Sequence, residues 1–265
     1  MIAEDRVHIL LRRSSVTSIK EPIRLAAVGD LHCPKTSEEV LGTLFTYVNT
    51  HADILLLCGD LTDYGKPEEA TKLAKLLGNV TIPMLGVLGN HDYESGKEEE
   101  VCRILCEAGV TILDGDARIH YEIGFVGVKG FAGGFDDKAL QPWGETALKQ
   151  FVRESIDEGQ KLESALAKTQ ILNRIALLHY SPIASTTHGE APEIVPFLGS
   201  SHLEDALNRY SVMAAFHGHA HHGSPTGHTK DQIPIYNVAL PLLQRVYPDR
   251  PPVGIFEIPS VAPGT

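Results

Sequence analysis

The sequence predicts an α/β fold with more than one mixed β-sheet. Short apolar runs alternate with helical patterns along most of the chain, and further strand-like runs follow without a helix between them. The five clearest runs are continuously apolar, which is typical of strands covered on both faces. They cover residues 23–30, 53–60, 83–90, 174–180 and 211–219.

Helical patterns separate the first three runs. Residues 36–51 open with Thr36 and Glu39 in capping-box spacing, and apolar residues then recur at helical spacing. Residues 66–78 place Pro67 at a first helical position. Further helices are expected over 95–109, 145–169 and 201–210. Additional strands are expected over 7–13, 110–113, 119–128, 233–238 and 253–258.

Length and composition favour one globular domain over residues 1–265. Of these residues 43% are hydrophobic and 22% charged, and no linker of low complexity divides the chain. The net charge of −11 disfavours a nucleic-acid partner, because nucleic-acid binding usually depends on a basic surface.

The sequence also favours a cytoplasmic protein. It has no apolar span of about 18 residues, so no transmembrane helix is predicted. The acidic N-terminal residues and their short apolar stretch do not resemble a secretory signal. No two of the four cysteines have CxxC spacing, so we expect reduced thiols.

Each of the five buried runs ends at a polar residue that can bind a metal ion. In chain order these residues are Asp30, Asp60, Asn90, His179, and His217 with His219. The functional crevice of an open α/β sheet lies at the carboxyl ends of its strands, so we expect these side chains to meet there. Asp30 and His32 are two residues apart, so both side chains point the same way in an extended segment. His217 and His219 have the same spacing.

The donor types predict a metal centre of two ions. Carboxylate, amide and imidazole ligands suit Mn, Fe, Co or Zn, and the set lacks the thiolates of a structural zinc site. Its seven members exceed the needs of one tetrahedral ion. Two ions that share a bridging carboxylate would use them all, an arrangement known for displacement at phosphorus.

The motifs "GDLH", "GDLTD", "GNHD", "LHY" and "GHAH" occur in this order. Together they resemble the calcineurin-like metallophosphoesterase superfamily, over residues 25 to about 240. The resemblance implies two stacked mixed sheets flanked by helices, a four-layer sandwich. It implies that Asp30, His32, Asp60 and His219 hold one metal. It also implies that Asp60, Asn90, His179 and His217 hold the second, with Asp60 bridging.

The resemblance also implies a role for His91, which matches the family's histidine that acts on the substrate phosphate or the leaving group. A hydroxide bridging two ions would be the nucleophile, and His91 would protonate or hydrogen-bond the departing oxygen. Asp63 has two interpretations: it orients His91, or it is a turn or capping residue.

Other polar and aromatic residues are expected to lie outside the metal centre. His221 and His222 are expected on the loop after the ligands, and Cys33 is expected to face away from His32 in an extended segment. Residues 130–145 are glycine-rich and contain three aromatic residues, so they form either a lid over the metals or a surface insertion.

The favoured substrate is a small-molecule phosphodiester, such as a cyclic nucleotide or a nucleotide conjugate. Phosphoprotein phosphatases of the superfamily carry an arginine where this chain has Tyr64, and the arginine pairs with a monoester dianion. The alternatives are a phosphomonoesterase or protein phosphatase, a nuclease, and a non-catalytic metal-binding scaffold. The acidic charge disfavours the nuclease, and a complete ligand set disfavours the scaffold.

Overall fold

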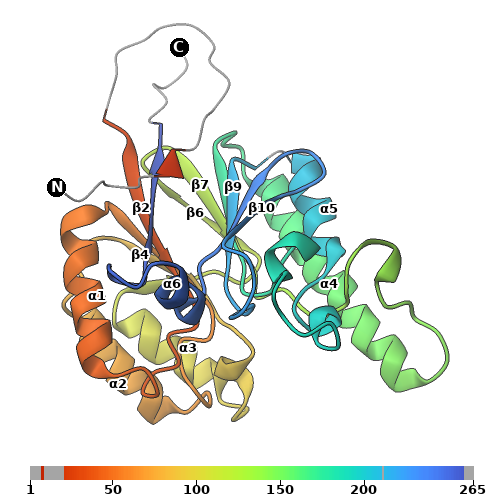
Figure 1. The fold of residues 1–265 in the computed structure, drawn as a ribbon, viewed down its shortest axis with the longest axis horizontal. Coiled ribbons are helices and arrows are strands. Elements are labelled where there is room, and N and C mark those ends of the chain that lie inside the picture. The colour runs from red at the N-terminus through yellow and green to blue at the C-terminus, as the bar shows by residue number, and fades with distance from the viewer. Residues whose placement is uncertain (1–6, 9–20, 211, 260–265) are drawn as a thin grey trace, which may run out of the picture.

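Two six-stranded β-sheets form the centre of the molecule (Figure 1). The computed structural model describes residues 7–8, 21–210 and 212–259. The first sheet contains, in spatial order, β1 (Val7–His8), β12 (Gly254–Ile258), β2 (Ile23–Val28), β3 (Ile54–Cys58), β4 (Met84–Val87) and β5 (Val110–Ile112). The second contains β10 (Thr226–His228), β11 (Pro234–Asn237), β9 (Ala214–His217), β8 (Arg174–Leu177), β7 (Ile123–Gly127) and β6 (Asp116–His120).

Both sheets are mixed. Strands β2 to β5 run parallel, and β12 pairs antiparallel with β2. In the second sheet β11, β9, β8 and β7 run parallel, and the edge strands β10 and β6 are antiparallel. Parallel strands of this kind need both faces covered.

Helices supply that cover and complete four layers. The helices are α1 (Glu38–His51), α2 (Pro67–Leu77), α3 (Glu98–Glu107), α4 (Thr146–Lys168), α5 (Ser201–Tyr210) and α6 (Leu240–Val246). Side chains of α1, α2 and α3 pack in one core with the first sheet, and those of α4 and α5 pack in another with the second. A third core joins the inner faces of the two sheets, with Phe125, Phe216 and Phe256 among its members. The predicted fold class is therefore confirmed.

Local side chains determine where helices α1 and α2 begin. Helix α1 is capped by Ser37, whose hydroxyl accepts from the Val40 amide at 3.3 Å, rather than by the expected Thr36. Helix α2 begins at Pro67 as expected, and Glu69 accepts from the amides of Tyr64 (2.8 Å) and Lys66 (3.4 Å). This carboxylate fixes the chain between the second strand-end motif and the helix.

One strand expectation is wrong. Residues 119–128 form a hairpin, β6 and β7, instead of a single strand. Tyr121 and Glu122 at the turn have φ angles of 50° and 64°, the conformation of a tight hairpin. Glycine or asparagine usually marks such a turn, and this one has neither. Of the strand expected at 7–13, residues 9–13 lie outside the described residues.

Three short 3₁₀ helices of the loops matter for the site. They are η1 (His91–Tyr93), η3 (Ala184–Thr187) and η4 (Val195–Phe197), and a fourth, η2 (Asp136–Lys138), lies farther along the β7–α4 connection. Within the described ranges, none of the helices has the length and apolar character that crossing a bilayer requires.

Candidate metal centre

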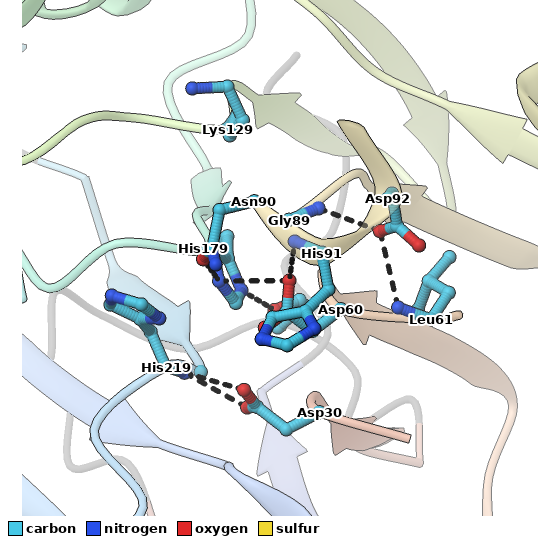
Figure 2. Close-up of polar contacts among 12 residues, drawn as sticks. Asp30, Asp60, Leu61, Gly89, Asn90, His91, Asp92, Lys129, His179 and His219 are labelled. Carbon is cyan, nitrogen blue, oxygen red and sulfur yellow. Dashed lines mark hydrogen bonds and ion pairs between the residues drawn. The ribbon is translucent and has the colours of Figure 1, made fainter. Parts of the chain in front are cut away.

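The candidate ligands lie in loops at the carboxyl ends of the parallel strands (Figure 2). In the first sheet, Asp30 and His32 follow β2, Asp60 follows β3, and Asn90 follows β4. In the second sheet, His179 follows β8, and His219 and His221 follow β9. The two sheets therefore contribute facing halves of one site, at the edge where strand-end residues were expected to meet.

The backbone at several of these positions is left-handed. The φ angles are 56° at Asp30, 42° at His32, 49° at Asp60 and 69° at His219. Aspartate and histidine tolerate this region better than most residues, and residues held there cluster at functional sites. The amide of Asp30 donates to the Gly59 carbonyl at 2.9 Å and that of His32 to the Asp60 carbonyl at 3.0 Å. These hydrogen bonds fix the first two ligand loops side by side.

One group of potential ligands contains Asp30, His32 and His221. Their ligand atoms all lie within 4.8 Å of one another. His221 Nε2 lies 2.9 Å from Asp30 Oδ1. The neighbouring His219 contributes only its backbone here, since its amide donates to both Asp30 carboxylate oxygens, at 3.1 and 2.9 Å.

A second group contains Asp60, His179 and His219, and a third, which shares His32 with the first, contains His32, Asp63 and His91, again within 4.8 Å. His179 Nε2 lies 3.3 Å from Asp60 Oδ1 and 2.9 Å from Asn90 Oδ1. The other nitrogen, Nδ1, lies 3.1 Å from the Cys58 carbonyl, which fixes it as the N–H donor. Nε2 is left with its lone pair toward Asp60 and Asn90, as a metal ligand requires.

The Asp60 carboxylate belongs to the second group and also lies close to the first. Besides its contact with His179, it lies 3.8 Å from His32 Nε2 and accepts from the backbone amide of His91 at 2.8 Å. It is 1% exposed. One carboxylate in reach of both groups is the arrangement that a shared ligand needs.

Burial keeps the imidazoles of His32, His179 and His219 neutral, whereas the hydrogen bond with Asp30 raises the pKa of His221 against the effect of burial. Burial lowers the pKa of His32 and of His219 to about 4, against the attraction of Asp30. The pKa of His179 falls well below its usual range, through burial first and then the charge of His219, with Lys129 a lesser cause. Neutral imidazole is the form that binds metals.

The two carboxylates respond to the same environment in opposite ways. Burial, reinforced by the charge of Asp30, holds the pKa of Asp60 well above its ordinary value. Burial also acts to raise the pKa of Asp30, but the hydrogen bond from His221 together with the charges of His179, His221 and His32 outweighs it and holds that pKa well below the usual range. Two buried carboxylates of like charge repel each other, and a bound cation would offset this repulsion.

The residues present fit a metal centre. Neither ring nitrogen of His32 forms a hydrogen bond with any residue that the structure describes, although both are buried. A buried polar atom without a partner is costly, and a metal ion is the partner that the surrounding carboxylates and imidazoles would accept. The oxygen and nitrogen donors suit Mn, Fe, Co or Zn.

The structure places His217 differently from the sequence expectation. Its ring is fully buried, with Nδ1 2.7 Å from the Gly218 carbonyl and Nε2 2.9 Å from the Thr186 hydroxyl. It belongs to none of these groups. His219 stands where His217 was expected, and His221 stands where His219 was expected. The reason is the position at which β9 ends. His217 is the last residue of the strand and is buried, so the loop that can reach the site begins only after it. The "GHAH" motif itself places His219 and His221 two residues apart, which is the sequence signal for this alternative pair.

Asp63 also differs from its expected role. The backbone carbonyl of Asp63, rather than its carboxylate, contacts His91, accepting from Nδ1 at 2.6 Å. The carboxylate lies 3.3 Å from His32 Nδ1 instead. The reason is the pairing of this loop with the first ligand loop, since the Asp63 amide donates to the Cys33 carbonyl and Cys33 pairs with Thr62. That pairing directs the Asp63 side chain toward His32.

His91 stands at the front of the site, where its ring meets that of His32 edge-on with centroids 4.6 Å apart. With Nδ1 committed to the Asp63 carbonyl, Nε2 is the nitrogen free to take part in chemistry.

Asp92 is a buried residue that sequence reasoning missed. Its carboxylate accepts from the amides of Leu61 (3.2 Å), Thr62 (2.8 Å) and Gly89 (2.8 Å), and from the Thr62 hydroxyl (2.6 Å). Figure 2 shows its dashed-line contacts with Leu61 and Gly89, which link the second and third ligand loops. An aspartate directly after "GNH" is the sequence signal that could have identified it.

Two of the three aromatic residues in 130–145 pack onto the body of the protein. Phe135 is buried, and Phe131 contacts Phe151 and Tyr180. Trp143 is 72% exposed. Packing of Phe131 and Phe135 is the behaviour expected of a surface insertion.

The fold and this site together define a metal-binding phosphoesterase. The family model for calcineurin-like phosphoesterases matches residues 23–223, and the chain belongs to that family. A search of curated proteins by sequence gave no match.

Solved structures show the same fold at low sequence identity. The phosphopantetheinyl hydrolase of Mycobacterium tuberculosis is 16% identical with a TM-score of 0.65, and the match covers 92% of this chain and 99% of that one. The protein TT1561 of Thermus thermophilus is 13% identical, with a TM-score of 0.53 and coverage of 84% and 91%. A putative 5′-nucleotidase from Staphylococcus aureus is 11% identical, with a TM-score of 0.52 and coverage of 91% and 55%.

Proposed function

We propose that this protein hydrolyses a small-molecule or nucleotide phosphodiester at a centre of two metal ions. The observation that carries the proposal is that the buried Asp60 carboxylate belongs to the group with His179 and His219 and also lies 3.8 Å from Nε2 of His32, a member of the other group. Asp30, His32, Asp60 and His221 would hold one ion. Asp60, Asn90, His179 and His219 would hold the other.

Two such ions, when bound, would activate water and offset the negative charge of the phosphoryl group. The protein's own part is to hold the ligands in place and to keep the imidazoles of His32, His179 and His219 neutral. Hydrogen bonding of His179 Nδ1 to the Cys58 carbonyl holds the ring orientation, and the Asp92 carboxylate holds the loops that carry Asp60 and Asn90.

His91 would supply the general acid. Its Nδ1 donates to the Asp63 carbonyl, so a proton on Nε2 can be given to the leaving oxygen. Its backbone amide, bonded to the Asp60 carboxylate, fixes the ring relative to the metal ligands. Loss of the ring would therefore lower turnover without removing any residue that is proposed above as a metal ligand.

The preference for a diester rests on Tyr64. This side chain is 49% exposed, and the Lys66 ammonium lies 5.0 Å from its ring centroid. A tyrosine cannot offer the bidentate guanidinium contact that favours a monoester dianion.

The test compares hydrolysis of bis-p-nitrophenyl phosphate and p-nitrophenyl phosphate, with Mn²⁺ and after chelation. Wild type and His91→Ala are compared with His222→Ala, whose side chain contacts Arg245 on the surface. We expect metal-dependent cleavage of the diester that His91→Ala lowers about 100-fold or more and His222→Ala leaves intact. A preference for the monoester would support a phosphatase. Bound metal without turnover of either ester would support the scaffold.

A further inference from the structure

Lys129 is fixed beside the metal centre by its backbone. It comes two residues after the end of β7, and its carbonyl accepts from the amides of His179 (3.0 Å) and Tyr180 (3.1 Å). The residue is thus bonded directly to the segment that carries a candidate ligand. Figure 2 draws it on the side of Asn90 remote from Asp30.

Three aromatic rings surround the Lys129 ammonium. Nζ lies 5.5 Å from the ring centroid of Tyr93, 5.0 Å from that of Phe131 and 5.4 Å from that of Tyr180. Aromatic faces attract a cation through their quadrupole, so the rings hold the ammonium in place while offering it no lone pair. We call Lys129 and these three residues the lysine cage.

The ammonium forms no ion pair within the described part of the chain, although Glu158, Glu154 and Asp114 lie near enough to oppose the lowering of its pKa by burial. Nζ donates to the Gly130 carbonyl at 2.9 Å, and no carboxylate of the described residues forms an ion pair with it. The nearby Glu158 is already engaged, with one oxygen 2.7 Å from Lys161 Nζ and the other accepting from the Gly130 amide at 2.7 Å. An ammonium has three donors, so two remain for a ligand.

Two of the cage rings belong to the metal-ligand loops. Tyr93 ends the 3₁₀ helix that begins at His91, and Tyr180 follows His179, with its ring centroid 4.5 Å from that of His219. The cage therefore borders the second group of ligands. Lys129 itself makes no hydrogen bond or ion pair with any described ligand side chain, so it is not one of the candidate metal ligands.

Resting on the function proposed above, we infer that Lys129 binds a second anionic group of the substrate, a phosphate or carboxylate distinct from the scissile phosphate. The metal centre would bind the scissile phosphate. The Lys129 ammonium would form an ion pair with the second anionic group of the substrate, on the Asn90 side of the centre. The substrate class is thus a phosphodiester with additional negative charge, a preference that the acidic protein as a whole would not predict.

The test uses two p-nitrophenyl diesters that differ only in a second anion: thymidine 5′-(p-nitrophenyl phosphate) with and without a 3′-phosphate. Both are assayed in Mn²⁺ with wild type, Lys129→Met and Lys129→Arg. We expect wild type to prefer the 3′-phosphorylated ester in kcat/KM, and Lys129→Met to reduce that preference about 10-fold or more, mainly through KM. Lys129→Arg should restore part of it. The control Lys161→Met removes a neighbouring lysine that is already paired with Asp114 and Glu158, and should keep the preference.

Binding provides a readout independent of turnover. Calorimetry compares thymidine 3′,5′-bisphosphate with thymidine 5′-monophosphate on the Mn²⁺-loaded protein. Loss of the bisphosphate advantage in Lys129→Met alone supports the inference. Equal loss for both ligands, or a wild type without preference, overturns it and leaves Lys129 a packing residue. Absence of any metal-dependent hydrolysis by wild type would instead overturn the proposed function, and the binding comparison would still decide the role of Lys129.

Discussion

In the first sheet, the loops after β2, β3 and β4 supply both carboxylates, the amide and one imidazole of the candidate centre. In the second sheet, the loops after β8 and β9 supply imidazoles only. The oxygen-rich half carries the charge that attracts cations, and its loops are linked by backbone hydrogen bonds and by Asp92. In the imidazole half, burial lowers the pKa of His179 and of His219, whereas the hydrogen bond with Asp30 raises the pKa of His221. The difference teaches that one sheet would set the charge of the centre and the other its geometry.

The largest effect is expected where the two halves meet. Asp60→Asn weakens the shared ligand, so metal-dependent diester hydrolysis should fall more than about 100-fold and metal content should drop. Steady-state rates in Mn²⁺ and metal analysis after dialysis measure this. The control Asp137→Asn changes an exposed carboxylate of the same type. A variant with full metal content and wild-type rate would show that the halves do not share Asp60.

The next prediction distinguishes His221, a proposed metal ligand, from His217, a buried residue outside the metal centre. His221→Ala should weaken Mn²⁺ binding about 10- to 100-fold, because the ring contacts Asp30. His217→Ala should keep the metal stoichiometry but lower the free energy of unfolding by about 2–3 kcal/mol, because a buried, hydrogen-bonded ring is lost. Titration calorimetry and thermal denaturation provide the two measurements. The opposite pattern would restore the arrangement expected from sequence.

An effect of similar size, on stability alone, tests the link within the first half. Asp92→Ala leaves three buried amides without their acceptor, those of Leu61, Thr62 and Gly89. We expect the free energy of unfolding to fall by about 2–4 kcal/mol. Urea denaturation measures it, with Asp92→Asn as the control that keeps an acceptor oxygen. Equal stability of wild type and Asp92→Ala would mean that the loops are held by other contacts.

The smallest effect lies outside the site, where β2 and β3 begin. Burial acts to raise the pKa of Asp53, but hydrogen bonds from Arg24 outweigh it and the pKa is lowered. A carboxyl with a lowered folded-state pKa stabilises the protein above its unfolded pKa of about 3.9, and this stability is lost as pH falls through the folded value. Asp53→Asn should therefore cost about 1 kcal/mol at pH 7 and progressively less below about pH 4. Urea denaturation across this range checks it, and a pH-independent difference would argue against the ion pair.

The first half of the centre was well predicted from sequence and the second half only in part. Buried parallel strands are continuous apolar runs, so the polar residue after each run is visible, and Asp30, Asp60 and Asn90 all follow this rule. In "FHGHAHHG" four histidines compete, and sequence does not show at which residue β9 ends. The rule therefore selected His217, which is the last buried residue of the strand, and left out His221.

Roles that depend on backbone were also beyond the sequence. The contact between His91 and Asp63 is made by a carbonyl, which every residue possesses. The hairpin at Tyr121 and Glu122 lacks the usual turn residues, so the pattern suggested one long strand. Side-chain type predicts chemistry well, whereas main-chain contacts depend on how distant segments meet.

The left-handed backbone at Asp30, His32, Asp60 and His219 has a consequence for the rate of metal uptake. Hydrogen bonds between the loops hold these residues in a sparsely populated conformation, so the donors are arranged by the polypeptide itself. An arriving ion would therefore need to exchange its hydration shell but not to reorganise the chain. Stopped-flow uptake should then scale with the water-exchange rate of the ion chosen and change little with solvent viscosity.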